Sequence, residues 1–145
     1  MLLLAFGFGM IALTVAIHTT GAAWWLSRTS RRIQQGVHKH RRLSIFYIIS
    51  TTASALLLLH LLEAMLWAVL YIILPGRSGL ANFAEALYFS MITFTTLGYG
   101  DVTLAPEWRS LAGMEAMVGI VVFGLSTAIL FAMIQRSWQA FEQRK

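Results

Sequence analysis

The chain has 145 residues, of which 58% are hydrophobic and 12% are charged, and its formal net charge is +5. Soluble domains are about one quarter charged, so this composition excludes an ordinary soluble enzyme domain, a disordered chain and a nucleic-acid-binding tail. The absence of cysteine excludes a disulfide scaffold, a cysteine-based zinc site and a thiol nucleophile. The composition predicts an all-α integral membrane protein.

The first 27 residues contain no Asp, Glu, Lys or Arg, and a spanning helix needs about 20 apolar residues. A secretory signal peptide is the alternative, but its positive charge would precede the apolar core, whereas here Arg28 follows it. We therefore expect residues 1–27 to be an extra N-terminal transmembrane helix with its N-terminus outside. Residues 28–42 are polar and basic, which predicts a cytoplasmic loop.

Two further apolar runs follow, each with a single charged residue. Residues 43–74 contain Glu63 and are expected to form an outer helix, and residues 110–135 contain Glu115 and are expected to form an inner helix. All Lys and Arg except Arg77 and Arg109 then lie on one side, which favours a multi-pass protein of the cell inner (plasma) membrane with its C-terminus cytoplasmic. The tail, residues 136–145, is too short for a soluble ligand-binding domain.

A short helix is expected between these two runs. Asn82 is a typical N-cap, and Glu85 completes a capping box. A helix over residues 83–94 would be about 18 Å long, which is half of a bilayer. The irregular residues 95–101 follow, and irregular backbone at membrane depth occurs only where it is buried in protein or lines a water-filled cavity. This segment is predicted to face a pore.

The segment Thr96–Asp101 reads TLGYGD, which resembles the TVGYGD selectivity filter of potassium channels. The resemblance implies that K⁺ ions bind to oxygen atoms of the filter residues, with four chains around one axis. Such a backbone alternates between left- and right-handed conformations, and glycine adopts a positive φ at little cost. The residues implied to coordinate K⁺ are Thr96, Leu97, Gly98, Tyr99 and Gly100.

The third apolar run reads GIVVFGLSTA from Gly119, which resembles the inner helix of small bacterial two-helix potassium channels. The resemblance covers about residues 43–135 and leaves the first helix as an addition to that pore-loop family. It implies a gating hinge at Gly119, although close helix packing is the alternative role. It also implies that the cavity and gate are lined by Ile120, Phe123, Thr127 and Phe131.

The expected support of the filter departs from the family at three positions. The usual acid of the short helix is replaced by Ile92, and the usual Trp pair by Tyr88 and Phe89, so the Tyr88 hydroxyl is expected to reach Asp101. We also expect Glu115 to be neutral or to bond a hydroxyl of the short helix, such as that of Ser90 or Thr93, in a structural or a gating role. The residues assigned to filter support are Thr95, Asp101, Tyr88, Ile92 and Glu115.

An intramembrane polar network is predicted from His18, His60 and Glu63. His60 and Glu63 share one helix face, and ionisable groups inside a membrane are costly, so they invite a functional explanation. Three roles stay open, namely docking of the extra helix, proton sensing and metal binding. His60 and Glu63 by themselves supply only two ligands, and the missing third and fourth ligands argue against a metal.

These features predict a potassium-selective channel that conducts K⁺ passively as a homotetramer in the lipid bilayer. The K⁺ ions are the only bound cofactor expected, and no nucleic-acid partner is expected. A non-selective cation channel, a pore subunit of a potassium transport system and an adaptor with a dead pore are the alternatives. No catalytic residues are predicted, because the sequence has no Ser-His-Asp spacing, phosphate loop or paired catalytic carboxylates.

Overall fold

The computed structural model describes residues 2–36, 41–74 and 79–142. Within these ranges the fold is all-helical, which confirms the predicted class. The elements in chain order are α1 (Leu2–Gly36), α2 (Arg41–Ile73), α3 (Phe83–Phe94), the 3-10 turn η1 (Pro106–Trp108) and α4 (Arg109–Glu142).

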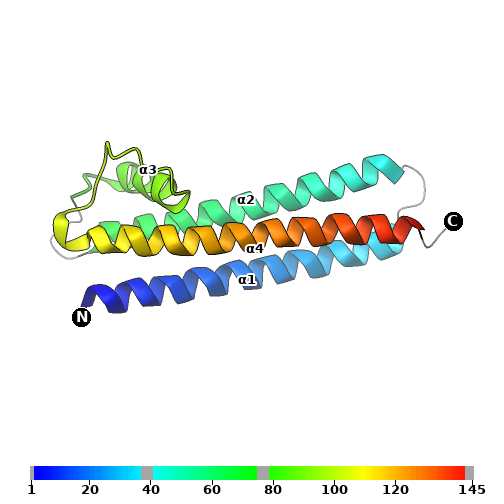
Figure 1. The fold of residues 1–145 in the computed structure, drawn as a ribbon, viewed down its shortest axis with the longest axis horizontal. Coiled ribbons are helices and arrows are strands. Elements are labelled where there is room, and N and C mark those ends of the chain that lie inside the picture. Colours follow the sequence, from blue (N-terminus) through cyan, green and yellow to red (C-terminus); the bar gives the residue numbers. More distant parts are fainter. Residues whose placement is uncertain (1, 37–40, 75–78, 143–145) are drawn as a thin grey trace.

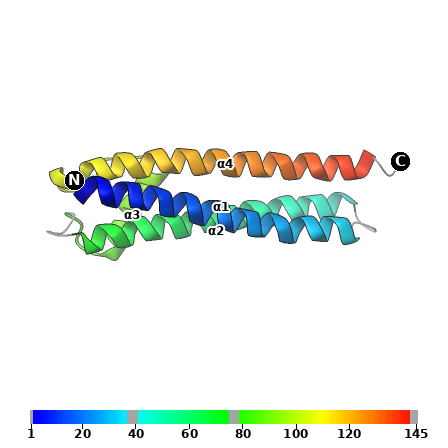
Figure 2. The same cartoon turned by 90° about the horizontal axis from the view of Figure 1, so that it is seen from below.

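Three of the helices are long and apolar enough to cross a membrane, over Leu3–Ser30, Phe46–Ile73 and Pro106–Arg136. They lie side by side along the long axis, and the N- and C-termini are at opposite ends (Figure 1). The turned view shows the same bundle with α1 in front of α2 and α4 (Figure 2). The expected three-span organisation is therefore present in the described residues.

The short helix α3 lies beside α2 and α4, at the end of the bundle that holds the N-terminus (Figure 1). The Asn82 side chain caps it by accepting a hydrogen bond of 3.0 Å from the Glu85 N–H. The Glu85 carboxylate in turn accepts the N–H of Ala81, one residue before the cap. This modified capping box fixes where α3 begins, and its buried face joins the core formed by Trp67, Tyr71, Phe94, Leu111 and Val122.

The helices continue beyond the ends expected from hydropathy. Residues 28–36 are helical instead of forming a loop, and α4 extends past residue 135 to Glu142. Helical backbone hydrogen bonding does not depend on apolar side chains, so it continues into the polar residues. Where the apolar run of α1 ends, the Arg28 guanidinium covers the Trp24 ring, 4.6 Å from the ring centre. Residues 37–40 and the expected helix stop at residues 75–76 lie outside the described residues.

Candidate pore loop and intramembrane polar clusters

The backbone after α3 has a positive φ at every second residue. The φ angles are 61° at Thr96, 51° at Gly98 and 79° at Gly100, and Thr96 is the one non-glycine residue with positive φ in the described ranges. A left-handed conformation costs a residue with a Cβ roughly 1–2 kcal/mol, so Thr96 is held there by its surroundings. Alternation of this kind lets successive carbonyl groups point in one direction.

Hydrogen bonds to the last turn of α3 hold this backbone in place. The Thr96 N–H donates to the Thr93 carbonyl at 2.9 Å, and the Gly98 N–H donates to the Ile92 carbonyl at 3.0 Å. The Thr95 hydroxyl donates to the Met91 carbonyl at 2.7 Å. Carbonyl groups that would be unpaired at the end of a helix are thereby used to fix the loop. Ile92 contributes to this support through its backbone, while its side chain is buried.

The C-terminal end of the loop is tied back to α3. The Tyr88 hydroxyl donates to the Asp101 carboxylate at 2.7 Å, which is the contact expected from the sequence. This hydrogen bond is the largest cause that raises the pKa of Tyr88 above its ordinary value of 10.0. The phenol is therefore protonated and able to donate at neutral pH.

A buried polar cluster behind the loop, the Glu115 cluster, joins α2, α3 and α4. The Tyr71 hydroxyl donates to one Glu115 oxygen at 2.5 Å, and Ser90 bonds the other oxygen. Ser90 also lies 2.7 Å from the Ala64 carbonyl, to which its single hydroxyl proton can be donated. Three hydrogen bonds need three protons, and the two hydroxyl groups supply only two, so we expect the Glu115 carboxyl to carry the third. Tyr71 was missed by the sequence analysis, although it lies one turn after Trp67 on the face of Glu63.

The residues assigned to the cavity do not share one environment in the single chain. Ile120, Thr127 and Phe131 are exposed on α4. Phe123 is partly buried, with its ring centre 4.2 Å from that of His60 and 5.9 Å from that of Phe94. Phe123 thus packs against His60 and Phe94 of its own chain.

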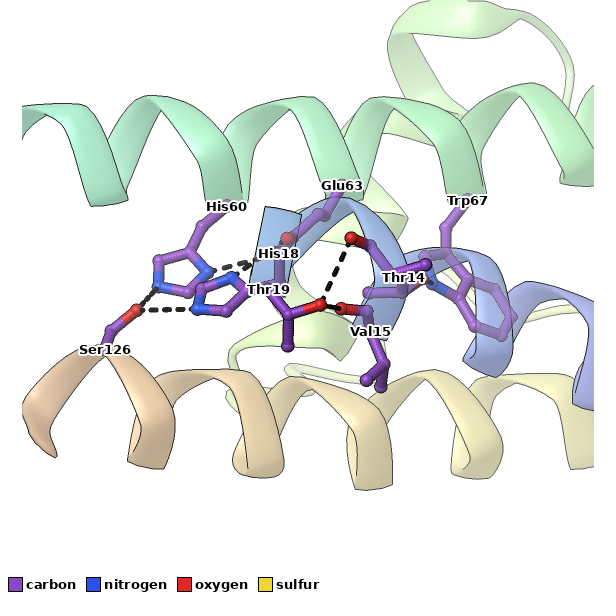
Figure 3. Close-up of polar contacts among 9 residues, drawn as sticks. Thr14, Val15, His18, Thr19, His60, Glu63, Trp67 and Ser126 are labelled. Atoms are coloured by element: carbon purple, nitrogen blue, oxygen red, sulfur yellow. Dashed lines mark hydrogen bonds and ion pairs between the residues drawn. The ribbon is translucent and has the colours of Figure 1, made fainter. Parts of the chain in front are cut away.

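A second buried cluster, the histidine cluster, consists of His18, His60, Glu63 and Ser126 (Figure 3). The Nδ1 atoms of His18 and His60 lie 3.0 and 3.2 Å from different oxygens of Glu63. Their Nε2 atoms lie 3.3 and 3.0 Å from the Ser126 Oγ. The two rings stack at 5.2 Å, and all four side chains are buried. The three residues predicted from the sequence therefore meet, and they do so around a serine of α4.

Ser126 was not singled out in the sequence analysis, because one small polar residue in an apolar span is common. The sequence gives little indication of its role, since only the packing of α4 against α1 and α2 places Ser126 between the two histidines. One turn away, the Trp67 indole N–H donates to the Thr14 hydroxyl at 3.1 Å, which adds a second polar contact between α1 and α2. These contacts dock α1 onto the rest of the bundle.

Comparison with known proteins places this arrangement in a family. A family model described as "Ion channel" matches residues 55–136, which is more than half of the chain. The chain belongs to the ion channel family. The matched part of this ion channel runs from α2 through the loop to α4 and leaves α1 outside.

A curated relative is the potassium voltage-gated channel protein shk-1 of Caenorhabditis elegans, which is 35% identical over 57 residues. The match covers 39% of this chain and 11% of the relative, so the chain spans about a tenth of that protein's length. No solved structure matches the chain.

Proposed function

We propose that this ion channel conducts K⁺ passively through a pore formed by four copies, with residues 96–100 as the selectivity filter. The observation that carries the proposal is the positive φ at Thr96, Gly98 and Gly100, directly after a helix too short to cross a membrane. The similarity to a protein named as a potassium channel supports it.

The proposed mechanism uses the backbone in place of water. Carbonyl oxygens of consecutive filter residues, with the Thr96 hydroxyl, replace the hydration shell of K⁺ as it passes. The C-terminal end of α3 carries the negative end of its helix dipole and favours a cation nearby. K⁺ is the transported ion in this mechanism, and no chemical step is required.

The exposure of two filter side chains supports assembly with other copies. Leu97 is 56% exposed and Tyr99 is 68% exposed in one chain, although both are large apolar side chains at membrane depth. A single loop cannot enclose an axis, and neighbouring copies would cover these side chains. We place the tetramer in the plasma membrane with the N-terminus outside, because this topology keeps most Lys and Arg in the cytoplasm.

A reversal potential tests the proposal. Purified protein is reconstituted in a planar bilayer with K⁺ on one side and Na⁺ on the other, and its mass in the same lipid is measured by native mass spectrometry. A reversal potential far from zero, with the sign that K⁺ selectivity requires, and a mass of four chains are expected. Clear currents that reverse near zero would instead indicate a non-selective cation channel. A mass other than four chains would contradict the proposed assembly.

A further inference from the structure

The hydrogen bonds of the histidine cluster require a definite number of protons. There are four contacts, two between the histidines and Glu63 and two between the histidines and Ser126. Each neutral imidazole carries one ring proton, Ser126 carries one, and an ionised Glu63 carries none. Three protons are therefore available for four contacts, so one contact would lack a hydrogen.

One further proton satisfies every contact. Both Nδ1–H groups then donate to Glu63, the protonated histidine donates its Nε2–H to Ser126, and the Ser126 hydroxyl donates to the Nε2 of the other histidine. The same proton balances the charge, because one imidazolium is paired with one carboxylate. Glu63 and His18 have no exposed surface, and an unbalanced charge at such a buried position is strongly unfavourable.

We propose that the histidine cluster is a binding site for one proton, shared by His18 and His60, which links α1 to α4 through Ser126. His18 lies on α1, His60 and Glu63 on α2, and Ser126 on α4, so the proton completes contacts among three helices (Figure 3). This site lies outside the filter and does not depend on K⁺ conduction.

No other ionisable group in the described residues competes for this proton at close range. The phenylalanine rings that contact His60 are those of Phe94 on α3 and Phe123 on α4, which do not titrate. On α2 and α4, Tyr71 and Glu115 bond each other and Ser90 in the separate Glu115 cluster. On α1, the Thr14 hydroxyl bonds Trp67, and the Thr19 hydroxyl donates to the Val15 carbonyl.

The sign of the pH dependence follows from the proton count. Separated histidines are neutral above about pH 7, whereas the assembled cluster retains one extra proton. The assembled state therefore binds more protons than the separated one, and its stability falls as the pH rises. Alkaline pH is expected to loosen α1 from α4, next to Thr127 of the proposed cavity.

The proton can be counted directly by ¹⁵N NMR of histidine-labelled full-length protein in lipid bilayers. The variant H38Q/H40Q leaves His18 and His60 as the only labelled rings. At about pH 8, where free histidine is neutral, one protonated ring per chain is expected. Adding Glu63→Gln to the H38Q/H40Q variant should abolish the protonated ring, because a neutral glutamine requires no balancing charge.

Matched variants separate the site from general damage. Glu115→Gln makes the same substitution at the other intramembrane glutamate and should leave the protonated ring in place. Ser126→Ala should lower the pH at which half of the protonated ring is lost by about one to two units, since a hydrogen bond to a charged group contributes roughly 1.5–3 kcal/mol. The unfolding temperature in detergent should fall between about pH 6 and about pH 9 in the parent protein and stay level in Glu63→Gln.

Two results would overturn the proposal. One is a pair of neutral rings at about pH 8 in the parent protein. The other is a change in the signals of both rings on adding Cd²⁺ that is reversed by EDTA. That result would make the cluster a metal site, which is sterically feasible because its ligand atoms lie within 4.8 Å of one another. Neither readout requires a conducting channel, so failure here is distinct from failure of the proposed K⁺ conduction.

Discussion

Gly119 of α4 lies against the carbonyl oxygen of Phe94, at the end of α3. A Cβ atom at position 119 would lie 2.1 Å from that oxygen, and the obstacle is backbone that cannot rotate away. The last turn of α3 sets the start of the loop, so this contact joins α4 directly to the proposed filter. α4 runs without interruption from Arg109 to Glu142, and in this structure Gly119 acts as a packing residue.

Gly119→Ala is expected to push α3 away from α4 and to destabilise the protein by about 1–3 kcal/mol, the usual cost of overpacking. Chemical denaturation and K⁺ flux from liposomes measure the two effects. Gly124→Ala is the control, because a Cβ there meets nothing within 4 Å. Equal stability of the two variants would show that the contact at Phe94 yields easily.

Gly98→Ala isolates the role of backbone conformation in the loop. A Cβ at Gly98 meets nothing within 4 Å in the chain, but φ is 51°, which costs alanine about 1–2 kcal/mol. We expect loss of K⁺ selectivity or current in bilayer recordings, with helix content unchanged by circular dichroism. Gly113→Ala, also in open space but without a positive φ, should conduct normally. A normal reversal potential in Gly98→Ala would argue against residues 96–100 as the filter.

The Glu115 cluster predicts that a neutral side chain of the same shape is tolerated. Glu115→Gln retains an acceptor and a donor for Tyr71 and Ser90, so its unfolding free energy should stay near that of the parent. Glu115→Ala leaves the buried Tyr71 hydroxyl without this partner and should cost about 1–3 kcal/mol, whereas Ser90 retains the Ala64 carbonyl. Denaturation of both variants at neutral pH measures the difference. A glutamine variant as unstable as the alanine variant would mean that Glu115 is ionised.

The bond between Tyr88 and Asp101 is expected to stabilise the conducting loop. Tyr88→Phe removes the donor and should speed the decay of the K⁺ current, and Asp101→Asn should produce a similar change if this bond is its main contact. Because the pKa of Tyr88 is raised above 10.0, the contribution is complete at neutral pH and is lost only above about pH 10. Decay rates recorded in steps of pH test this. If the effects of Tyr88→Phe and Asp101→Asn on the decay rate are additive in the double variant, the two residues act separately.

Phe131 is 60% exposed on α4, one turn after Thr127 on the same helix. If four copies of this side chain close a hydrophobic gate, Phe131→Ala should raise the open probability by allowing water to enter. Single-channel recording measures it. Phe46→Ala is a matched control, because Phe46 is also exposed but lies on α2. An unchanged open probability in Phe131→Ala would remove the gate from this position.

Much of the fold is readable from local signals. Long apolar runs predict three spanning helices because a membrane leaves no alternative partner for backbone hydrogen bonds. The cap at Asn82 marks the start of α3, and the alternating glycines at 98 and 100 indicate the conformation of the loop. The predicted helix ends were less accurate, because helical hydrogen bonding continues through the polar residues that follow the apolar runs of α1 and α4.

Local sequence patterns were enough to identify the class of protein, its spans and the loop motif, since each depends on neighbouring residues and on the lipid. They did not indicate which distant polar groups meet, and this became clear from the packing of the helices. The packing placed Ser126 between His18 and His60, Tyr71 against Glu115, and Gly119 against Phe94. These partners are far apart in the chain, and helix periodicity does not specify how three helices rotate against one another. Packing fixes that rotation, because every buried polar group must find a partner where water is absent.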